Sequence, residues 1–170
     1  MRIALLIDDE FEDSEFIYPY HRLQEAGHSV DIIGKKAGAY FGKHETRADA
    51  SLGIDDAISD RYDALYIPGG YAPERLCKIP EMIAFVQAMR LHGKIICAVC
   101  HGPLLLAEAG ILKGQRVTGY GTTKERLERA GADYSGESVV ADGDLITARD
   151  PKSLPEMTTL LLQMLHDYTL

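Results

Sequence analysis

The fold of this chain is decided by the stretch Ile95-Ile96-Cys97-Ala98-Val99-Cys100-His101-Gly102-Pro103. Its first five residues are a continuous apolar run of strand length, which is typical of a central parallel strand covered on both faces. Gly102 interrupts that strand, and Pro103 suits the first turn of a helix, where the missing N–H of proline costs nothing. The pattern therefore predicts a tight strand-to-helix turn with Cys100 at its apex.

Cys100 is the candidate nucleophile. A thiol at this turn lies near the positive end of a helix dipole, which lowers the thiol pKa and favours the reactive thiolate. A free cysteine is more often an inert core residue, and we interpret Cys97, inside the apolar run, in that way. The two cysteines match the C-x-x-C redox spacing. However, ~10 Å of strand between their Cα atoms is more than the ~7 Å that a disulfide tolerates.

Metal ions and cofactors are not expected. Cys77 is the only other cysteine, and no spaced pair of histidines accompanies it. The sequence therefore lacks the usual ligand pattern of a zinc site, and we expect neither a metal centre nor a bound cofactor.

Length and composition describe one globular domain, which we assign to residues 1–170. The chain is 46% hydrophobic and 26% charged, and 26 acidic against 18 basic residues give a net charge of −8. An acidic chain without a basic stripe is a poor partner for nucleic acid. No apolar run approaches the ~20 residues of a membrane span, and the first run, residues 3–7, reads as a strand and not as a signal peptide. An odd number of cysteines favours a reducing compartment, so we expect a cytoplasmic protein.

Apolar runs of strand length alternate with segments of helical periodicity along the chain. We expect strands at 3–7, 28–33, 64–67, 95–99, 117–118, 139–141 and 145–148, and helices at 14–26, 80–92, 103–109, 124–130 and 154–165. Segment 35–52 suggests short hairpin-like pieces at an edge. Strands that alternate with helices predict an α/β fold, in which a parallel sheet carries helices on both faces.

Several residues predict how these elements begin and turn. Asp13 is expected to cap the first helix, and Ser153 and Glu156 are expected to form a capping box at the last one. Pro19 predicts a kink in the first helix or a late start. Asp142 and Gly143 predict a hairpin turn between the last two strands.

Three segments follow expected strands and are candidates for a common site: residues 8–15, 68–70 and 100–101. Ligands of parallel α/β sheets bind beyond the carboxyl ends of the strands, where these segments converge. Gly69 and Gly70 allow a substrate to approach the backbone closely. Together with the amide of His101, their N–H groups could form an oxyanion hole for attack by Cys100. The Pro-Gly-Gly sequence is equally typical of an ordinary turn.

Glu12 and Glu15 permit two interpretations. A carboxylate close to Cys100 would raise the thiol pKa, whereas a protonated carboxyl group would donate to a thiolate or to an oxidised sulfur and stabilise it. Acids are also favoured at helix N-termini as solvated residues. From the residue pattern alone, the better interpretation is that Glu12 and Glu15 are solvated acids at a helix N-terminus.

Several separated motifs together resemble the ThiJ/PfpI superfamily, and most closely its PfpI branch of small intracellular proteins. They are Glu12-Asp13-Ser14-Glu15, Tyr18-Pro19-Tyr20-His21-Arg22-Leu23, Pro68-Gly69-Gly70, Ala72-Pro73-Glu74-Arg75 and Ala98-Val99-Cys100-His101-Gly102-Pro103. The resemblance extends from the first strand to the last helix. It implies a flavodoxin-like three-layer α/β/α sandwich with a mostly parallel sheet, similar to class I glutamine amidotransferases.

The resemblance also implies roles for individual residues. Cys100 would be the nucleophile, His101 its neighbouring base, and Glu15 the acid that hydrogen-bonds the cysteine. Glu74 of a neighbouring subunit would complete a Cys-His-Glu triad, which implies a homodimer that can assemble further into a hexamer. The substrate pocket would be formed by Glu12, Lys43, Gly69, Gly70 and Tyr120.

The chain departs from the PfpI pattern at two positions. Tyr71 stands where close relatives often carry a basic residue, and Gly121 stands where a proline is common. Members of the superfamily are described as intracellular peptidases, protein deglycases, glyoxalases and redox-sensing chaperones. The resemblance implies a cysteine-dependent hydrolase of the PfpI type, acting as a peptidase or on carbonyl adducts of proteins. The alternatives are a redox-sensing stress protein and a glutathione-independent glyoxalase.

Overall fold

The structure, a computed structural model, describes residues 1–169 and is organised around a seven-stranded sheet. The strand order is β10-β11-β7-β6-β1-β2-β5. All neighbouring pairs are parallel except β10 and β11, which form a hairpin. The strands are β1 (Arg2–Leu6), β2 (Ser29–Gly34), β5 (Leu52–Gly53), β6 (Ala64–Ile67), β7 (Ile95–Val99), β10 (Val139–Asp142) and β11 (Leu145–Ala148).

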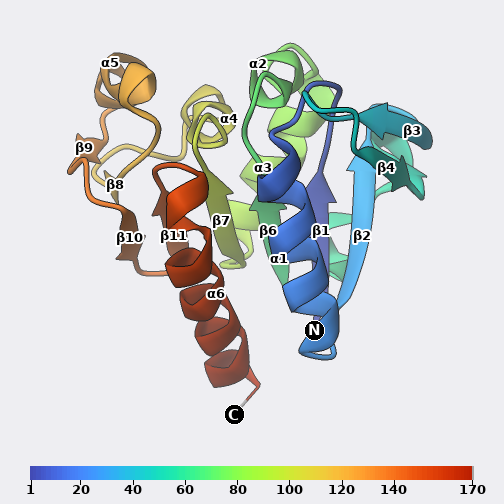
Figure 1. Ribbon diagram of the computed structural model, residues 1–170. Coiled ribbons are helices and arrows are strands. Elements are labelled where there is room, and N and C mark those ends of the chain that lie inside the picture. The colour runs from blue at the N-terminus through green and yellow to red at the C-terminus, as the bar shows by residue number, and fades with distance from the viewer. Residues whose placement is uncertain (170) are drawn as a thin grey trace.

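Helices cover both faces of this sheet. Figure 1 shows α1 and α6 in front of the sheet and α3 and α4 behind it. The helices are α1 (Asp13–Glu25), α2 (Ala72–Leu76), α3 (Pro80–Leu91), α4 (Pro103–Glu108), α5 (Lys124–Arg129) and α6 (Leu154–Tyr168). The predicted three-layer α/β/α sandwich with a mostly parallel sheet is confirmed.

Two small sheets lie beside the main one. β3 (Gly38–Phe41) and β4 (Arg47–Ala50) pair in antiparallel fashion, as the hairpin-like pattern of segment 35–52 predicted. β8 (Arg116–Val117) and β9 (Asp133–Tyr134) form a short parallel pair. The β3–β4 hairpin is the more important for the site, because the turn between its strands carries Lys43.

Each face of the sheet has its own apolar core. Phe16 and Leu23 of α1 pack with Leu161 of α6 and with the side chains of β1 that face them. On the other face, Phe85 of α3 and Leu105 of α4 pack in the second core. Residues 95–99 are completely buried, because the strand they form lies between the two cores. Cys97 is therefore a core residue, as its place in the apolar run predicted.

The predicted caps of two helices are wrong in detail. Asp13 is the first residue of α1, and its carboxylate instead accepts the backbone N–H groups of His44 (2.9 Å) and Thr46 (3.0 Å), which ties the β3–β4 turn to the helix. Ser153 does precede α6, but it makes no side-chain cap. Its hydroxyl donates to Asp150 (3.1 Å), because a 3₁₀ turn comes directly before the helix.

Pro19 does not delay the first helix, which runs from Asp13 to Glu25 with the proline inside it. A proline has no N–H, so the carbonyl four residues earlier, that of Glu15, loses its helical partner. The hydroxyl of Tyr66 on β6 donates to that carbonyl at 2.5 Å. The orphaned acceptor is therefore satisfied from the sheet.

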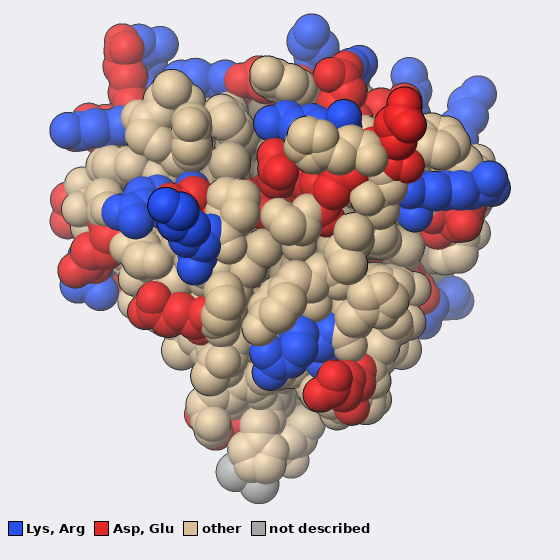
Figure 2. Space-filling view, in the orientation of Figure 1, with Lys and Arg blue, Asp and Glu red and all other residues tan. Residues whose placement is uncertain are grey.

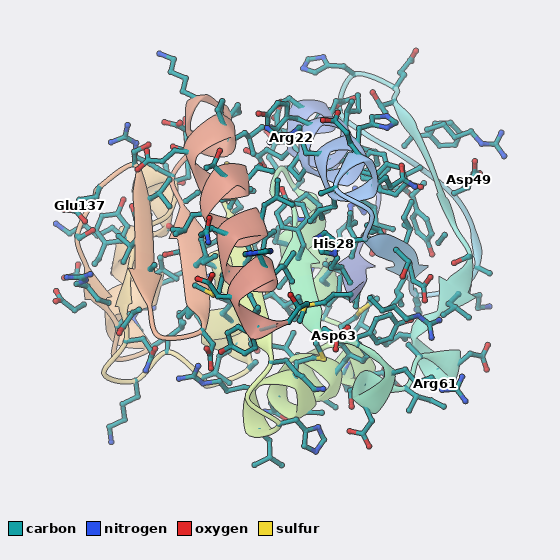
Figure 3. All side chains as sticks on the ribbon, turned by 90° about the horizontal axis from the view of Figure 1, so that it is seen from below. Arg22, His28, Asp49, Arg61, Asp63 and Glu137 are labelled. Atoms are coloured by element: carbon teal, nitrogen blue, oxygen red, sulfur yellow. The ribbon has the colours of Figure 1, made fainter. Side chains whose placement is uncertain are left out.

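Charged side chains lie at both ends of the sheet. Figure 3 views the end opposite the candidate site, where His28 and Asp63 are labelled. Asp63 accepts the backbone N–H of Arg2 at 2.8 Å, and burial lowers the pKa of His28. Figure 2 shows acidic and basic side chains interspersed along the upper rim, over the carboxyl ends of the strands. None of the helices within residues 1–169 has the length and apolar character needed to cross a membrane.

Candidate active site

Cys100 lies on a strained turn at the carboxyl end of β7. Its backbone φ is +62°, in the left-handed region that costs a non-glycine residue roughly 1–2 kcal/mol. Close packing allows this turn: a Cβ on Gly102 would lie 2.6 Å from the carbonyl oxygen of Ile67 on the neighbouring strand. The predicted strand-to-helix turn is confirmed, with β7 ending at Val99 and α4 beginning at Pro103. Strain of this kind is typical of functional sites.

His101 is the base nearest to the thiol. Its Nδ1 lies 3.3 Å from Sγ of Cys100, and its Nε2 lies 3.3 Å from the hydroxyl of Thr122. The ring packs against Tyr120, with 5.1 Å between the ring centroids. Burial lowers the pKa of His101. A neutral imidazole that can accept a proton therefore stands beside the thiol at neutral pH.

Glu15 is the buried acid of the site, and none of its surface is exposed. Burial raises its pKa from the ordinary 4.5 to about 8, which outweighs the hydrogen bond from the amide of Gly69. The charge of Glu12 raises the pKa further, whereas contact with the Cys100 thiol lowers it. The group is therefore mainly protonated at neutral pH, and its Oε2 has no hydrogen bond of good geometry. The structure thus excludes the interpretation of Glu15 as a solvated acid.

The thiol of Cys100 is not activated by its position alone. Burial raises its pKa to about 12, and Glu15 acts in the same direction when it is ionised. The backbone N–H groups of Gly70 and His101 act in the opposite direction. The predicted lowering of the pKa by the helix dipole is therefore wrong for this chain: α4 has only six residues, and Cys100 is 7% exposed. Formation of the thiolate at neutral pH therefore requires a neighbouring base that accepts the thiol proton.

The predicted oxyanion hole is only partly available. The N–H of Gly69 donates to Oε1 of Glu15 at 2.8 Å, so it holds the carboxyl group and does not face the substrate space. The N–H groups of Gly70 and His101 lie close enough to the sulfur to lower its pKa, and they are the donors that remain. A Cβ on Gly69 would lie 2.6 Å from Glu15 Oε1 and 2.7 Å from Cys100 Cβ, so the glycine is required by close packing.

A cavity of about 430 Å³ opens above the thiol. Lys43, from the β3–β4 turn, places its Nζ 3.2 Å from Oε2 of Glu12 and 4.6 Å from the ring centre of Tyr71. Although burial opposes the charge, the hydrogen bond with Glu12 raises the pKa of Lys43. The lining residues are Glu12, Lys43, Tyr71, Cys100, His101, Tyr120, Thr122 and Pro151. The cavity thus brings together the predicted pocket side chains of Glu12, Lys43 and Tyr120, whereas Gly69 and Gly70 are not among its lining residues.

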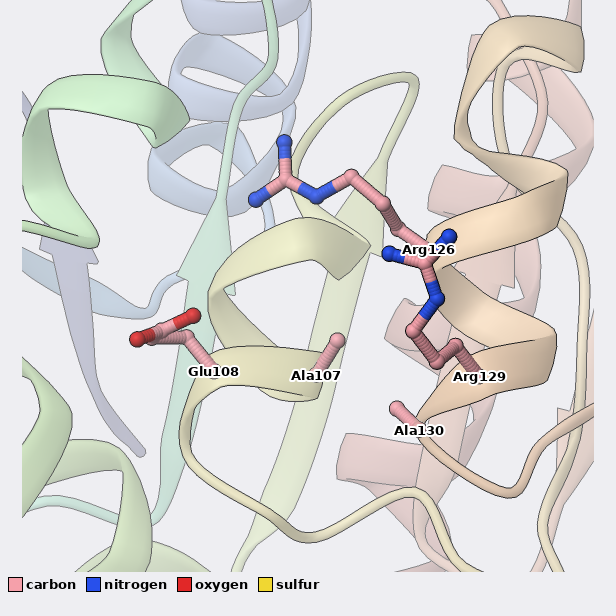
Figure 4. Close-up of a pocket in the computed structure, with 5 residues that line it drawn as sticks. All are labelled: Ala107, Glu108, Arg126, Arg129 and Ala130. Atoms are coloured by element: carbon pink, nitrogen blue, oxygen red, sulfur yellow. The ribbon is translucent and has the colours of Figure 1, made fainter.

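Glu74 does not contact His101 within the chain. It lies in the first turn of α2 and pairs with Arg126 of α5, and both side chains are half-exposed. Figure 4 shows the cavity of about 270 Å³ that Arg126 lines together with Glu108 and Arg129, between α4 and α5. That cavity contains none of the predicted site residues. Within residues 1–169, no cluster of three or more His, Cys, Asp or Glu side chains could hold a metal ion.

Three residues near the site were not identified from the sequence. Thr122 contacts His101, Pro151 lines the cavity, and the hydroxyl of Tyr66 reaches the Glu15 backbone. Thr122 and Pro151 belong to short 3₁₀ turns without a recognisable sequence motif. Tyr66 could have been inferred, because a proline inside a helix leaves a carbonyl that needs a donor from elsewhere.

Comparisons with known proteins agree with this geometry. The family model described as DJ-1/PfpI matches residues 1–164. The chain is 40% identical over 154 residues to Deglycase PfpI of Pyrococcus furiosus, covering 91% of this chain and 93% of that protein. It is 36% identical over 165 residues to the putative cysteine protease YraA of Bacillus subtilis, covering 96% and 98% of the two chains. A crystal structure of a two-domain protein with DJ-1/ThiJ/PfpI-like and ferritin-like domains, from Anabaena variabilis, matches with a TM-score of 0.96 and 39% identity. That match covers 98% of this chain and 50% of the two-domain chain.

Proposed function

Because the chain belongs to the DJ-1/PfpI family, we propose that it is a cysteine-dependent hydrolase acting on carbonyl groups of peptides or of glycated proteins. One observation carries the proposal: Sγ of Cys100, on a strained turn, lies 3.3 Å from Nδ1 of a neutral His101 at the base of a cavity. This is the spacing of a nucleophile and its general base. The names of the relatives, a deglycase and a putative cysteine protease, are consistent with such chemistry.

The first step is proton transfer. His101 accepts the thiol proton at Nδ1 as Sγ attacks the carbonyl carbon, so the thiolate forms only when a substrate is present. The protonated Glu15 adds no negative charge next to the developing thiolate. Because His101 accepts the proton and Glu15 is uncharged, a thiol whose pKa is raised to about 12 can act at neutral pH.

The second step is stabilisation of the oxyanion. Attack moves negative charge from sulfur to the carbonyl oxygen, and the N–H groups of Gly70 and His101, which lie close to the sulfur in the free site, are available to that oxygen. One such donor contributes roughly 10²–10³ in rate. Gly69 contributes indirectly, by holding Glu15.

The remaining steps release the products. The tetrahedral adduct collapses with cleavage of the carbon–nitrogen bond, and His101 returns its proton to the departing amine. Water then hydrolyses the thioester: its proton passes through His101 to sulfur, and the carboxylic acid leaves. In a glycated protein the nitrogen is bonded to a carbinol carbon beside the carbonyl group, so sulfur replaces the protein amine at that carbon and gives a hemithioacetal. A proton then moves from this carbon to the neighbouring carbonyl carbon, which gives the thioester that water hydrolyses.

We further propose that the active unit is a homodimer in which Glu74 of a neighbouring subunit faces Nε2 of His101. Within the chain, the hydroxyl of Thr122 contacts that nitrogen and supplies no charge. A carboxylate there would orient the ring and strengthen it as a base. Glu74 is half-exposed at the start of α2, where it can leave Arg126 to reach another subunit.

Turnover of a fluorogenic peptide and of a methylglyoxal-treated peptide tests the hydrolase proposal. Wild type is expected to release product from at least one of them, and Cys100→Ala and His101→Ala are expected to release none. Full activity of Cys100→Ala on both substrates would refute it.

Mixing of inactive subunits tests the shared site. Cys100→Ala and Glu74→Gln are each expected to be inactive, and co-refolded mixtures are expected to regain activity, because some sites then combine an intact Cys100 with an intact Glu74. Mixtures that remain inactive while they form mixed dimers would refute a contribution of Glu74 across the interface.

A second function is favoured by one observation, the protonated carboxyl group of Glu15 beside the sulfur. Peroxide would oxidise Cys100 stepwise to a sulfinic acid, with peroxide reduced to water, and Glu15 would donate to the sulfinate oxygen. Mass spectrometry after mild peroxide treatment separates the two functions: sulfinic acid confined to Cys100, without turnover of any substrate, would favour a redox sensor.

Conversion of methylglyoxal to lactate by wild type would instead indicate a glyoxalase that uses the same residues.

A further inference from the structure

Tyr66 holds the backbone of the residue whose side chain contacts the nucleophile. It lies on β6, is completely buried, and donates its hydroxyl to the carbonyl oxygen of Glu15 at 2.5 Å. No part of Tyr66 lines the cavity above Cys100. The hydroxyl of Tyr66 therefore reaches the site through its hydrogen bond to Glu15.

The bond exists because of Pro19. In an ordinary helix, the N–H of residue 19 would donate to the carbonyl of Glu15. Proline lacks this donor, and a buried carbonyl without a partner is strongly disfavoured. Pro19 thus leaves the Glu15 carbonyl without its helical donor, and the Tyr66 hydroxyl on β6 donates to it instead.

Glu15 is attached to β6 and the loop after it at two points. Tyr66 binds its backbone carbonyl, and the N–H of Gly69, three residues further along the chain, donates to its Oε1 at 2.8 Å. Two bonds from one rigid segment restrict both the backbone and the carboxyl group of a single residue. That restriction matters here because Oε2 has no hydrogen bond that would otherwise hold it.

We propose that Tyr66 is a positioning residue that, through the Glu15 backbone carbonyl left free by Pro19, holds the Glu15 carboxyl group against Cys100. The inference rests on the proposed function, in that it assumes Cys100 to be the reacting group. Without the hydroxyl, the first turn of α1 is free to shift, and the carboxyl group loses its place beside the sulfur. The thiolate then lacks the donor that a protonated Glu15 offers.

The reactivity of Cys100 toward iodoacetamide, measured against pH, tests this role. Alkylation is quantified on the Cys100 peptide by mass spectrometry, because Cys77 is also partly exposed. Tyr66→Phe is expected to slow alkylation at pH 7 about fivefold, equivalent to a coupling of about 1 kcal/mol, and to move the rate profile toward higher pH. A profile identical to that of wild type would overturn the proposal.

Two combinations separate positioning from general loosening of the fold. In a Glu15→Ala background, Tyr66→Phe is expected to have no further effect on Cys100, since the group through which it acts is gone. In the double variant Tyr66→Phe/Pro19→Ala, the new N–H at residue 19 satisfies the Glu15 carbonyl within α1 but does not attach it to β6, so the Tyr66→Phe profile is expected to persist. A full additional loss in the first combination, or a return to the wild-type profile in the second, would overturn the inference.

Tyr62→Phe is the matched control. It removes another buried tyrosine hydroxyl, which donates to Asp31 at 2.8 Å beyond the opposite end of β6, and is expected to leave the Cys100 profile unchanged. A shift in this control equal to that of Tyr66→Phe would refute a specific role of Tyr66. The two proposals fail differently: activity that survives Cys100→Ala refutes the hydrolase, whereas Cys100-dependent activity with an unaltered Tyr66→Phe profile refutes only this inference.

Discussion

Replacement of Glu15 by glutamine should make the protein more stable at alkaline pH and remove much of the pH dependence of its stability. The carboxyl group is fully buried, and burial raises its pKa from 4.5 to about 8. The folded state therefore holds a proton that the unfolded chain has already lost between these two values. Its contribution is fully present below pH 4.5 and is lost as the pH rises through about 8.

The magnitude follows from that shift. Each pH unit in this window changes the free energy of unfolding by about 1.4 kcal/mol, so the ionised carboxylate costs the fold on the order of 5 kcal/mol in total. Glutamine carries no charge at any pH, and its oxygen can still accept the N–H of Gly69. The free-energy difference between wild type and Glu15→Gln should therefore change by roughly 3.5 kcal/mol between pH 5 and pH 8.

Urea denaturation of both proteins, followed by circular dichroism at several pH values from 5 to 8.5, measures this difference. Taking the difference removes the titrations that the two proteins share, including those of His28 and His101. Glu15→Gln is expected to gain on wild type steadily as the pH rises. A difference that changes by less than about 1 kcal/mol over this range would refute a buried, protonated Glu15.

Other variants test the packing of the site. Cys100→Gly should be more stable than Cys100→Ala by roughly 1 kcal/mol, or about 2–4 °C in Tm, because only glycine adopts a φ of +62° without strain; a glycine variant that melts below the alanine variant would contradict this. Gly69→Ala should cost roughly 1–3 kcal/mol and most of the turnover, because its methyl group would overlap Glu15. The control Gly121→Ala, which has open space, should change neither quantity, and equal effects of the two would argue against the close packing. In the native protein, iodoacetamide should modify Cys100 and spare the fully buried Cys97, whose pKa burial raises; equal labelling would show that the core opens.

The strongest local patterns of the sequence determined the fold and the location of the site. An apolar run followed by Gly102 and Pro103 allows few structures other than a buried strand that turns into a helix, so the position of Cys100 followed from nearest neighbours in the chain. The alternation of strands and helices could also be predicted, because each element follows from the pattern of residues that are close in the chain. Because parallel strands end at one edge of a sheet, that alternation also predicted that the three segments would meet.

The first turns of helices were predicted less well, because several donors compete for one short side chain. Asp13 and Ser153 both have the composition of caps, yet each binds a group that only the folded chain brings near: the β3–β4 turn for Asp13 and the preceding 3₁₀ turn for Ser153. Pro19 shows both contributions, that of the sequence and that of the fold. Its effect on the Glu15 carbonyl is a property of the sequence, but the identity of the donor, Tyr66, depends on which strand passes beneath the helix.

The electrostatics of the site were decided by the tertiary structure alone. A dipole argument from residues next to Cys100 predicted a lowered thiol pKa, but the pKa is set by how much water both protein layers exclude and by a carboxyl group 85 positions away in the sequence. Burial also protonates Glu15, which no local pattern indicates. The sequence by itself thus determined where the nucleophile sits. Its protonation state, and the state of the acid beside it, came from desolvation, which sums over neighbours that are distant in the chain and close only in the fold.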